Sequence, residues 1–308
     1  MKWLKIITIN FLICIILFFI LDFIVYTRFY NNKQDIPWSQ KLLYYTQIFD
    51  NTKLEDKYIY SSLFRPTINP FSDKKPIAIF GCSYAYGSGL DNNQTFSYLL
   101  GKITGRPVYN RALGGMGLQF TYYQLSNKKF YKIVPKPEYI IYVYIQSHIP
   151  RMHTGGSFYY NRLISYKIKK QSDGNNYLVR DYPNELLSRS YLAFYLRTRI
   201  IKKIKYHPDA KTLELLQTYF MNIRKQAEKN WGKDIKFVIL LYEDEENLIT
   251  ISKVLENLEK KGFIIINAND VSGTNLKTID YQISESDSHP NEKAWKKLTP
   301  LLVKKLGL

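Results

Sequence analysis

Residues 76–89 read Pro-Ile-Ala-Ile-Phe-Gly-Cys-Ser-Tyr-Ala-Tyr-Gly-Ser-Gly. The first six form a continuous apolar run that ends in a glycine, and a glycine-rich loop containing Ser83 follows. A continuous apolar run, in place of an alternating one, is typical of a parallel strand that is covered on both faces. The stretch therefore predicts a buried strand whose carboxyl end carries a serine.

Four further apolar runs predict four more strands, at 107–112, 137–146, 234–243 and 263–268. Helical patterns lie between and after these runs, at about 94–103, 117–131, 187–205, 209–230, 245–261 and 291–306. Alternation of strands and helices predicts an α/β fold: a three-layer α/β/α sandwich around a mostly parallel sheet with right-handed crossovers. Ligands of such sheets bind at the carboxyl ends of the strands, so the loops that follow the strands are the ones to read for function.

Two regions interrupt this pattern. Residues 150–206 break the alternation and predict a mainly helical insertion within a domain that spans 76–308. Residues 31–75 have no clear period and contain several prolines, so we interpret them as a juxtamembrane stalk.

The N-terminus predicts a membrane anchor within residues 1–30. Lys2 and Lys5 precede an apolar run over 6–26, and 21 residues of helix span about 31 Å, close to the thickness of the hydrocarbon core. No small-x-small cleavage site follows, although a cleaved signal peptide or a buried core helix remain alternatives. We expect a single-pass protein in the lipid bilayer, with a cytoplasmic N-terminus and an extracytoplasmic domain on the periplasmic or cell-surface side.

Composition excludes several classes of protein. The chain is 45% hydrophobic and 16% aromatic, which is incompatible with intrinsic disorder. Cys14 and Cys82 are the two cysteines, too few for a disulfide scaffold, and nothing predicts a metal site. The loop at 81–89 matches neither a dinucleotide fingerprint nor a P-loop, so no cofactor is predicted.

The basic excess of 44 Lys+Arg over 26 Asp+Glu gives a net charge of +18. Its clearest cluster, over 189–205, has six basic residues interleaved with aromatic and aliphatic ones and no acid. Such a segment fits anionic lipid, an anionic glycan, or a solvated face of a packed helix. It matches no nucleic-acid reader motif, so we expect no nucleic-acid partner.

A second candidate loop reads Asp287-Ser288-His289-Pro290-Asn291, just before the last predicted helix. Pro290 favours an extended conformation at His289, and residues two apart in an extended stretch point to the same side. Asp287 can then orient the His289 imidazole, as in the base and orienter of a serine triad. The alternative is an ordinary helix entry with an exposed histidine.

A third loop, residues 110–117, follows the second predicted strand and is rich in glycine. Glycines there let backbone N–H groups approach an anionic oxygen at a helix N-terminus. The alternative is an ordinary strand-to-helix turn.

Together the three loops resemble the SGNH, or GDSL-like, hydrolase superfamily, whose fold has a flavodoxin-like sheet. The resemblance rests on Gly81-Cys82-Ser83, on the loop from Asn110 to Gly115, and on 287–291, and it covers 76–148 and 284–308 directly. It implies Ser83 as the nucleophile, His289 as the general base and Asp287 as its orienter. The N–H groups of Ser83 and Gly115 would form the oxyanion hole.

The chain departs from the family pattern at two positions. Cys82 stands where the family has an aspartate, and the third strand ends without the asparagine that donates to the oxyanion. Gln146 or His148 would have to replace that asparagine, whose loss typically costs about 2.7–4 kcal/mol of barrier. Asn110 and Arg151 are candidate substrate-binding residues, the latter for an anionic group.

Residues 81–85 also approximate the G-x-S-x-G elbow of α/β-hydrolases. In that fold the serine lies after several strands, whereas Ser83 follows the first, so the elbow is the weaker interpretation.

Two functional hypotheses follow. The first is a membrane-anchored SGNH-like serine esterase or O-acyltransferase acting on O-acylated envelope glycan or on lipid or small esters. The second is an inactive SGNH-like domain that binds a glycan or assembles with a partner at the membrane, which the missing asparagine favours.

Overall fold

The computed structural model describes residues 2–29, 64–154, 165–170, 176–181 and 208–308. Five strands form one parallel sheet in the order β2-β1-β3-β6-β7. Their bounds are β1 (Ile77–Gly81), β2 (Val108–Asn110), β3 (Tyr139–Tyr144), β6 (Lys236–Leu241) and β7 (Ile264–Asn267). Each lies within one of the five predicted apolar runs, so the parallel sheet predicted from the sequence is confirmed.

The strand order places a topological switch point beside β1. The chain continues from β1 to β2 on one side and from β3 towards β6 on the other, so the connections after these two neighbouring strands run in opposite directions. In open α/β sheets a crevice forms at such a point, outside the carboxyl ends of the strands. Ser83 follows β1 directly and therefore lies at the switch point.

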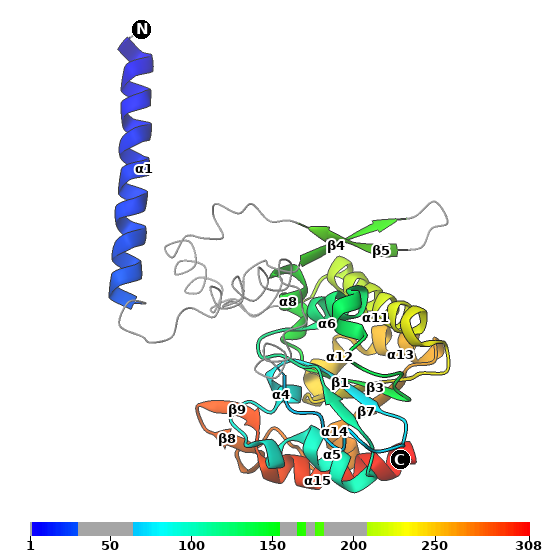
Figure 1. The fold of residues 1–308 in the computed structure, drawn as a ribbon. Helices are drawn as coiled ribbons and strands as arrows, with labels where there is room; N and C mark the ends of the chain where they lie inside the picture. The colour runs from blue at the N-terminus through cyan, green and yellow to red at the C-terminus, as the bar shows by residue number, and fades with distance from the viewer. Residues whose placement is uncertain (1, 30–63, 155–164, 171–175, 182–207) are drawn as a thin grey trace.

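Helices cover both faces of the sheet, which confirms the three-layer sandwich (Figure 1). Alternate strand residues face two separate cores: Phe80 and Tyr142 belong to one, Ile79 and Val143 to the other. The first core lies under α6 (Leu118–Ser126), α11 (Ala210–Trp231), α12 (Glu245–Ile249) and α13 (Ser252–Lys260). The second lies under α5 (Phe96–Thr104), α14 (Ala268–Ser272) and α15 (Glu292–Leu306).

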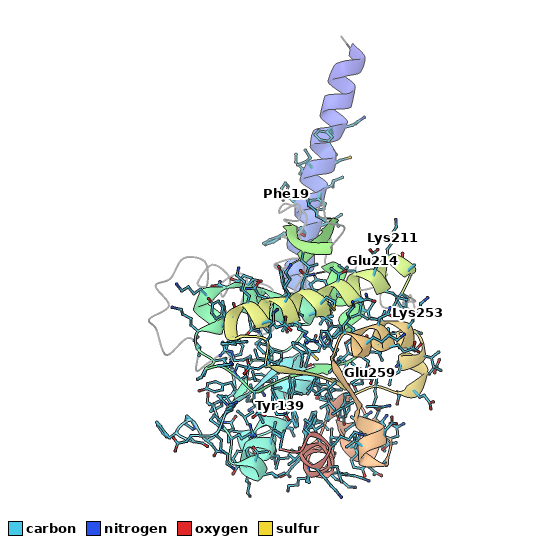
Figure 2. All side chains as sticks on the ribbon, turned by 90° about the vertical axis from the view of Figure 1, so that its right-hand side faces the viewer. Phe19, Tyr139, Lys211, Glu214, Lys253 and Glu259 are labelled. Atoms are coloured by element: carbon cyan, nitrogen blue, oxygen red, sulfur yellow. The ribbon has the colours of Figure 1, made fainter. Side chains whose placement is uncertain are left out.

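The outer surface of the first helical layer is charged. Figure 2 shows Lys211 and Glu214 on α11 and Lys253 and Glu259 on α13, away from the sheet. Tyr139, by contrast, is buried in the sheet. The opposite face of α11 carries its apolar residues at helical spacing, which is why this sequence forms an amphipathic cover for the sheet.

Residues 64–75 pack against the domain. Phe64 is buried, Ile68 forms a β-bridge with Val108, and the Asn69 amide donates to the Gly101 carbonyl at 2.7 Å. The stalk predicted over 31–75 thus has its last part attached to the domain, and its remainder lies outside the described residues.

The insertion contains a β-hairpin that was not predicted from the sequence. After α8 (His148–Thr154), β4 (Ser165–Lys170) and β5 (Asn176–Asp181) pair antiparallel. The prediction of a mainly helical insertion is therefore wrong for residues 165–170 and 176–181, which form strands. Their Tyr, Ile and Val residues favour strands, and the run is too short for a helical period to decide. The helix predicted over 187–205 lies outside the described residues.

The N-terminal residues form one 28-residue helix, α1 (Lys2–Phe29). Within the described part of the chain, no helix meets the length and apolar character needed to cross a membrane. The predicted anchor over 1–30 is not supported by that finding.

Candidate active site

The loop at 81–89, which carries the predicted nucleophile Ser83, begins with a sharp turn at Gly81, whose φ is +141°. A Cβ at this position would lie 2.9 Å from the Val143 carbonyl oxygen and 3.0 Å from the Ala85 Cβ. Only glycine fits between β1 and the short helix α4 (Ser83–Tyr86), and the turn brings Ser83, which is partly exposed, to the first position of that helix. Cys82 is fully buried in the core, which fits a packing role.

Replacing Gly81 by alanine should therefore destabilise the fold strongly. Backbone strain and the two close contacts together predict a loss of about 2–3 kcal/mol in the free energy of unfolding. Gly273 is a matched control, because its φ is also positive, at +63°, yet a Cβ added there would meet no atom within 4 Å. Gly273→Ala should cost only the left-handed penalty, about 1 kcal/mol. Equal losses in urea unfolding of the two variants would contradict this account of Gly81.

Arg65 fastens the loop after α4. Its guanidinium donates to the carbonyl oxygens of Gly87 at 2.6 Å and Leu90 at 2.8 Å and to Asn92 Oδ1 at 2.7 Å. It also lies over the Tyr86 ring, 4.6 Å from the centroid. These contacts give the segment 83–92 a defined shape.

The glycine-rich loop after β2 lies beside Ser83. Leu113 donates its backbone N–H to the Gly81 carbonyl at 3.3 Å, which ties the two loops together. A Cβ on Gly114 would lie 3.9 Å from the Ser83 Cβ, and Gly115, the next residue, has a φ of +73°. The structure thus brings the predicted oxyanion loop next to the predicted nucleophile.

Asp287 and His289 form the predicted pair. Both lie on β9 (Asp287–Pro290), which forms an antiparallel hairpin with β8 (Gln282–Ser284). Asp287 Oδ1 accepts from His289 Nδ1 and, at 3.1 Å, from the His289 backbone N–H. A carboxylate only accepts hydrogen bonds, so Nδ1 carries the proton and Nε2 is left as the basic nitrogen.

Hydrogen bonds from His289 keep Asp287 ionised. Burial raises the pKa of this carboxyl, but the backbone and ring N–H groups of His289 outweigh burial and leave the pKa below its ordinary value. A carboxylate that stays ionised near neutral pH can hold the imidazole in the tautomer described above.

Tyr84 connects the pair to the nucleophile helix. Its hydroxyl donates to the Ser288 carbonyl at 2.9 Å, and its ring lies against the His289 ring with centroids 5.2 Å apart. Because Tyr84 follows Ser83 in the chain, this contact brings His289 to the same sheet edge as the serine. In the described part of the chain, no hydrogen bond joins the Ser83 hydroxyl to His289.

Gln146 is engaged on the far side of β3, towards β6. Its backbone N–H donates to Glu243 Oε1 at 2.6 Å, and its amide reaches Thr250 Oγ1 at 3.4 Å. Tyr144 donates to its Oε1 at 3.4 Å. The side-chain amide is therefore held between Tyr144 of β3 and Thr250 at the end of α12.

His148 is enclosed in the core. It is 0% exposed, its Nδ1 lies 3.0 Å from the Tyr142 hydroxyl, and the rings of Tyr142 and Tyr144 pack on it. Burial first, and the nearby Arg151 second, hold its pKa well below the usual range, so it is neutral.

The two candidate substrate-binding residues have protein partners. Asn110 is 1% exposed and donates to the Ala85 carbonyl at 2.8 Å, while its Oδ1 accepts from Ala112 N–H at 3.1 Å. Arg151 is partly exposed and donates to the Met116 carbonyl at 2.9 Å. Asn110 is thus positioned to brace α4 against β2, and Arg151 braces the end of the oxyanion loop.

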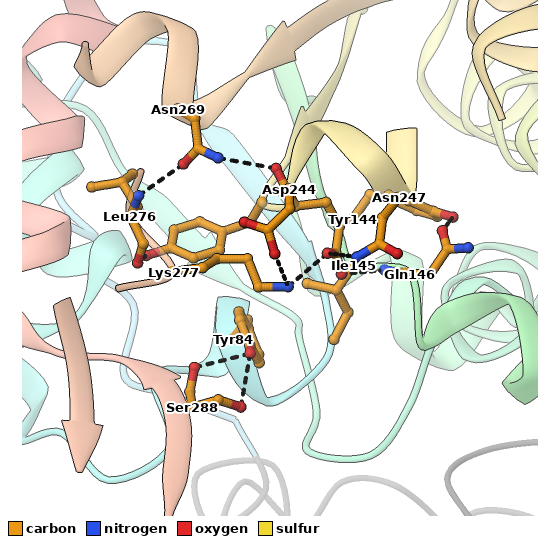
Figure 3. A network of polar contacts seen from close by, with 12 residues as sticks. Tyr84, Tyr144, Ile145, Gln146, Asp244, Asn247, Asn269, Leu276, Lys277 and Ser288 are labelled. Atoms are coloured by element: carbon orange, nitrogen blue, oxygen red, sulfur yellow. Dashed lines mark hydrogen bonds and ion pairs between the residues drawn. The ribbon is translucent and has the colours of Figure 1, made fainter. Parts of the chain in front are cut away.

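One network at this edge was not predicted from the sequence (Figure 3). Glu243 is 4% exposed and pairs with Lys277 at 2.6 Å. An acid directly after a continuous apolar strand was the available signal for Glu243, whereas no local pattern marks Lys277.

No cluster of three or more His, Cys, Asp or Glu side chains suited to a metal ion occurs among the residues that the structure describes.

No family model matches the chain, and no curated protein matches it either. Several solved structures are similar in fold. One is a carbohydrate esterase with divergent catalytic and non-catalytic binding functions (13% identity, TM-score 0.46). Another is an acetyl xylan esterase from the rumen bacterium Butyrivibrio proteoclasticus (10% identity, TM-score 0.46). A third is a member of the lipolytic G-D-S-L family from Veillonella parvula DSM 2008 (11% identity, TM-score 0.45).

The matches cover 76%, 76% and 75% of this chain. They cover 64% of each of the first two esterases, less than two thirds of their length, and 97% of the third protein. At these identities and TM-scores the likenesses assign neither a substrate nor catalytic residues to this chain.

Proposed function

We propose that the chain is an SGNH-like serine hydrolase, an esterase or O-acyltransferase that works through an acyl-enzyme. The observation that supports it is the placement of the Asp287–His289 pair against Tyr84, the residue next to Ser83. The Gly114–Gly115 loop also lies beside the serine. The residues proposed as nucleophile, base and oxyanion donors therefore lie at the same edge of the sheet, which supports the proposal.

In the first half of the proposed reaction, Ser83 Oγ attacks the ester carbonyl while its proton passes to His289 Nε2. The carbonyl oxygen becomes an oxyanion, which the backbone N–H groups of Ser83 and Gly115 would stabilise. Collapse of this intermediate breaks the ester C–O bond, and the leaving alcohol takes the proton from His289. Asp287 stays ionised and stabilises the transient imidazolium.

In the second half, a hydroxyl group attacks the acyl-enzyme. His289 Nε2 takes its proton, the oxyanion forms again, and the proton returns to Ser83 as the acyl–oxygen bond breaks. Water as the attacking group gives hydrolysis, and a sugar hydroxyl gives acyl transfer. The proposed substrates are O-acylated envelope glycans or lipid or small esters.

A specific observation favours a second candidate, an inactive SGNH-like domain that binds a glycan or a partner. Gln146 and His148, the two residues available to replace the missing asparagine, are held by Thr250 and Tyr142. The oxyanion would then have two backbone donors, and we expect a slow enzyme or none.

Turnover of acetylated sugars and p-nitrophenyl acetate by the purified full-length chain tests the proposal. We expect measurable hydrolysis of both, and inhibition by a fluorophosphonate. Binding of an acetylated glycan without turnover, together with no reaction with the fluorophosphonate, would favour the inactive binding protein.

The cellular location forms a separate part of the proposal: a single-pass membrane protein with its domain outside the cytoplasm. The exposed large apolar side chains of α1, such as Phe11, Phe19 and Phe23, each 63–66% exposed, support attachment to lipid. We expect the full-length chain to stay in the membrane pellet after alkaline carbonate washing, and a variant starting at residue 30 to be released. Release of both chains would contradict attachment through α1.

A further inference from the structure

The Glu243 carboxylate joins the ends of several elements at the edge that carries the candidate site, and its partners Gln146, Asn247 and Lys277 are labelled in Figure 3. It accepts from the Gln146 backbone N–H at 2.6 Å, from the Asn247 amide at 3.0 Å and from the Lys277 ammonium at 2.6 Å. Its own carbonyl oxygen accepts from Asn269 at 3.1 Å. One buried residue thus links the ends of β3, β6 and β7.

Lys277 lies at the start of the segment that leads to the base. Its ammonium contacts Glu243 at 2.6 Å and Asp244 at 3.6 Å, with the side chain 21% exposed. Leu276, beside it, is fixed through its N–H to Asn269 Oδ1 at 2.9 Å and through its carbonyl to the Tyr242 hydroxyl at 3.1 Å. The segment that follows contains η2 (Ile279–Tyr281), β8 and β9.

The far end of that segment is held by Tyr84. Its hydroxyl contacts both the carbonyl and the hydroxyl of Ser288, at 2.9 and 3.2 Å, between the two residues of the catalytic pair. Segment 276–291 is therefore attached at one end to the sheet edge through Glu243 and Lys277 and at the other to the nucleophile helix.

We infer that the Glu243–Lys277 ion pair is a positioning pair, which holds segment 276–291 so that His289 faces Ser83. The inference rests on the proposed function. Neither residue touches the reacting atoms; each acts through the backbone that it fixes. A buried ion pair adds little stability over apolar residues of similar volume, and what this pair provides is a set of directional contacts to the ends of several elements.

Two variants separate positioning from stability. Lys277→Met alone leaves a buried carboxylate without its cation and should lower the Tm by roughly 10 °C. The double variant Glu243→Gln/Lys277→Met has no uncompensated charge at these two positions, and the amide oxygen that replaces the carboxylate still accepts from the Gln146 N–H. Its Tm should return to within a few degrees of wild type, whereas its kcat should stay about 10- to 100-fold lower at an unchanged KM.

The experiment measures Tm, p-nitrophenyl acetate kinetics and hydrogen–deuterium exchange on full-length wild type, both variants and Glu243→Gln alone. Glu243→Gln keeps Asp244 beside Lys277, so the fold is retained, and an approximately tenfold fall in kcat is expected. The matched control is Lys136→Met/Asp234→Asn, which removes an exposed pair of 2.7 Å before β3 and β6, at the opposite end of the same strands. The control should leave kcat unchanged.

Faster exchange in 276–291 of the double variant and of Glu243→Gln, with the control at wild-type rates, would support the positioning role of the pair. This result would hold even if the wild-type chain showed no activity, which would contradict the proposed function but not the positioning role. If the double variant and Glu243→Gln both kept the wild-type kcat and the wild-type exchange rates, the positioning role would be overturned, while the proposed function would be unaffected.

Discussion

Ser83→Ala is expected to abolish labelling by a fluorophosphonate and to lower kcat for ester hydrolysis by at least about 10⁴-fold. The serine occupies the first position of α4 at the switch point, with the oxyanion loop beside it and Tyr84 connecting it to the base. Without its Oγ no acyl-enzyme can form, and water would have to attack directly. The fold should be unaffected, because Ser83 is partly exposed and its hydroxyl makes no hydrogen bond within the described part of the chain.

Thermal unfolding supplies the check on folding, and Ser252→Ala supplies a matched control. Ser252 is an exposed serine at the start of α13 whose hydroxyl donates to the Ile249 carbonyl, outside the candidate site. Its replacement should leave labelling near the wild-type rate. Equal activity of Ser83→Ala and wild type would rule out Ser83 as the nucleophile.

His289→Ala is expected to lower kcat about as strongly as Ser83→Ala, because nucleophile and base act as one unit. Asp287→Asn should cost up to about 10⁴-fold, since an amide in place of the carboxylate favours the wrong imidazole tautomer. The combination Ser83→Ala/His289→Ala should be no slower than either single variant. Losses that multiply in the double variant would show that the two residues do not act in the same step.

Asp287 also gives the site a pH dependence with a defined sign. Its pKa is lower in the folded chain than in the unfolded one, because the N–H groups of His289 outweigh burial. Its stabilising contribution is therefore fully present above the ordinary carboxyl pKa of about 3.9 and is lost as the pH falls through the lower folded-state value. Acid unfolding of Asp287→Asn should show less pH dependence in this range than wild type.

The sheet, and the placement of the main candidate residues at one of its edges, could be predicted from local sequence. Each strand of the sheet is a continuous apolar run, and burial on both faces requires such a run whatever the neighbouring strands are. Ser83 comes just after a strand of the sheet, where open α/β sheets bind ligands. The Asp287–His289 pair was predicted from its two-residue spacing in an extended stretch before Pro290.

What local sequence does not contain is the partner of each side chain. Lys277 meets Glu243 only because the fold brings the end of β6 beside a segment more than thirty residues later. His148 was a candidate oxyanion donor by position, but the helix that it begins turns its ring into the core. Arg65 lies next to the nucleophile loop although its neighbours in sequence have no regular pattern. These contacts depend on long-range packing, which periodicity does not encode.

The most direct test of Ser83 as the nucleophile is to locate the fluorophosphonate adduct. The purified full-length chain is labelled, digested and analysed by tandem mass spectrometry, with Ser83→Ala and His289→Ala treated in parallel. We predict a single adduct on the Ser83 hydroxyl in wild type, none in Ser83→Ala, and strongly slowed labelling in His289→Ala. An adduct on another residue, or no adduct on a wild-type chain that is folded, would contradict the proposed mechanism.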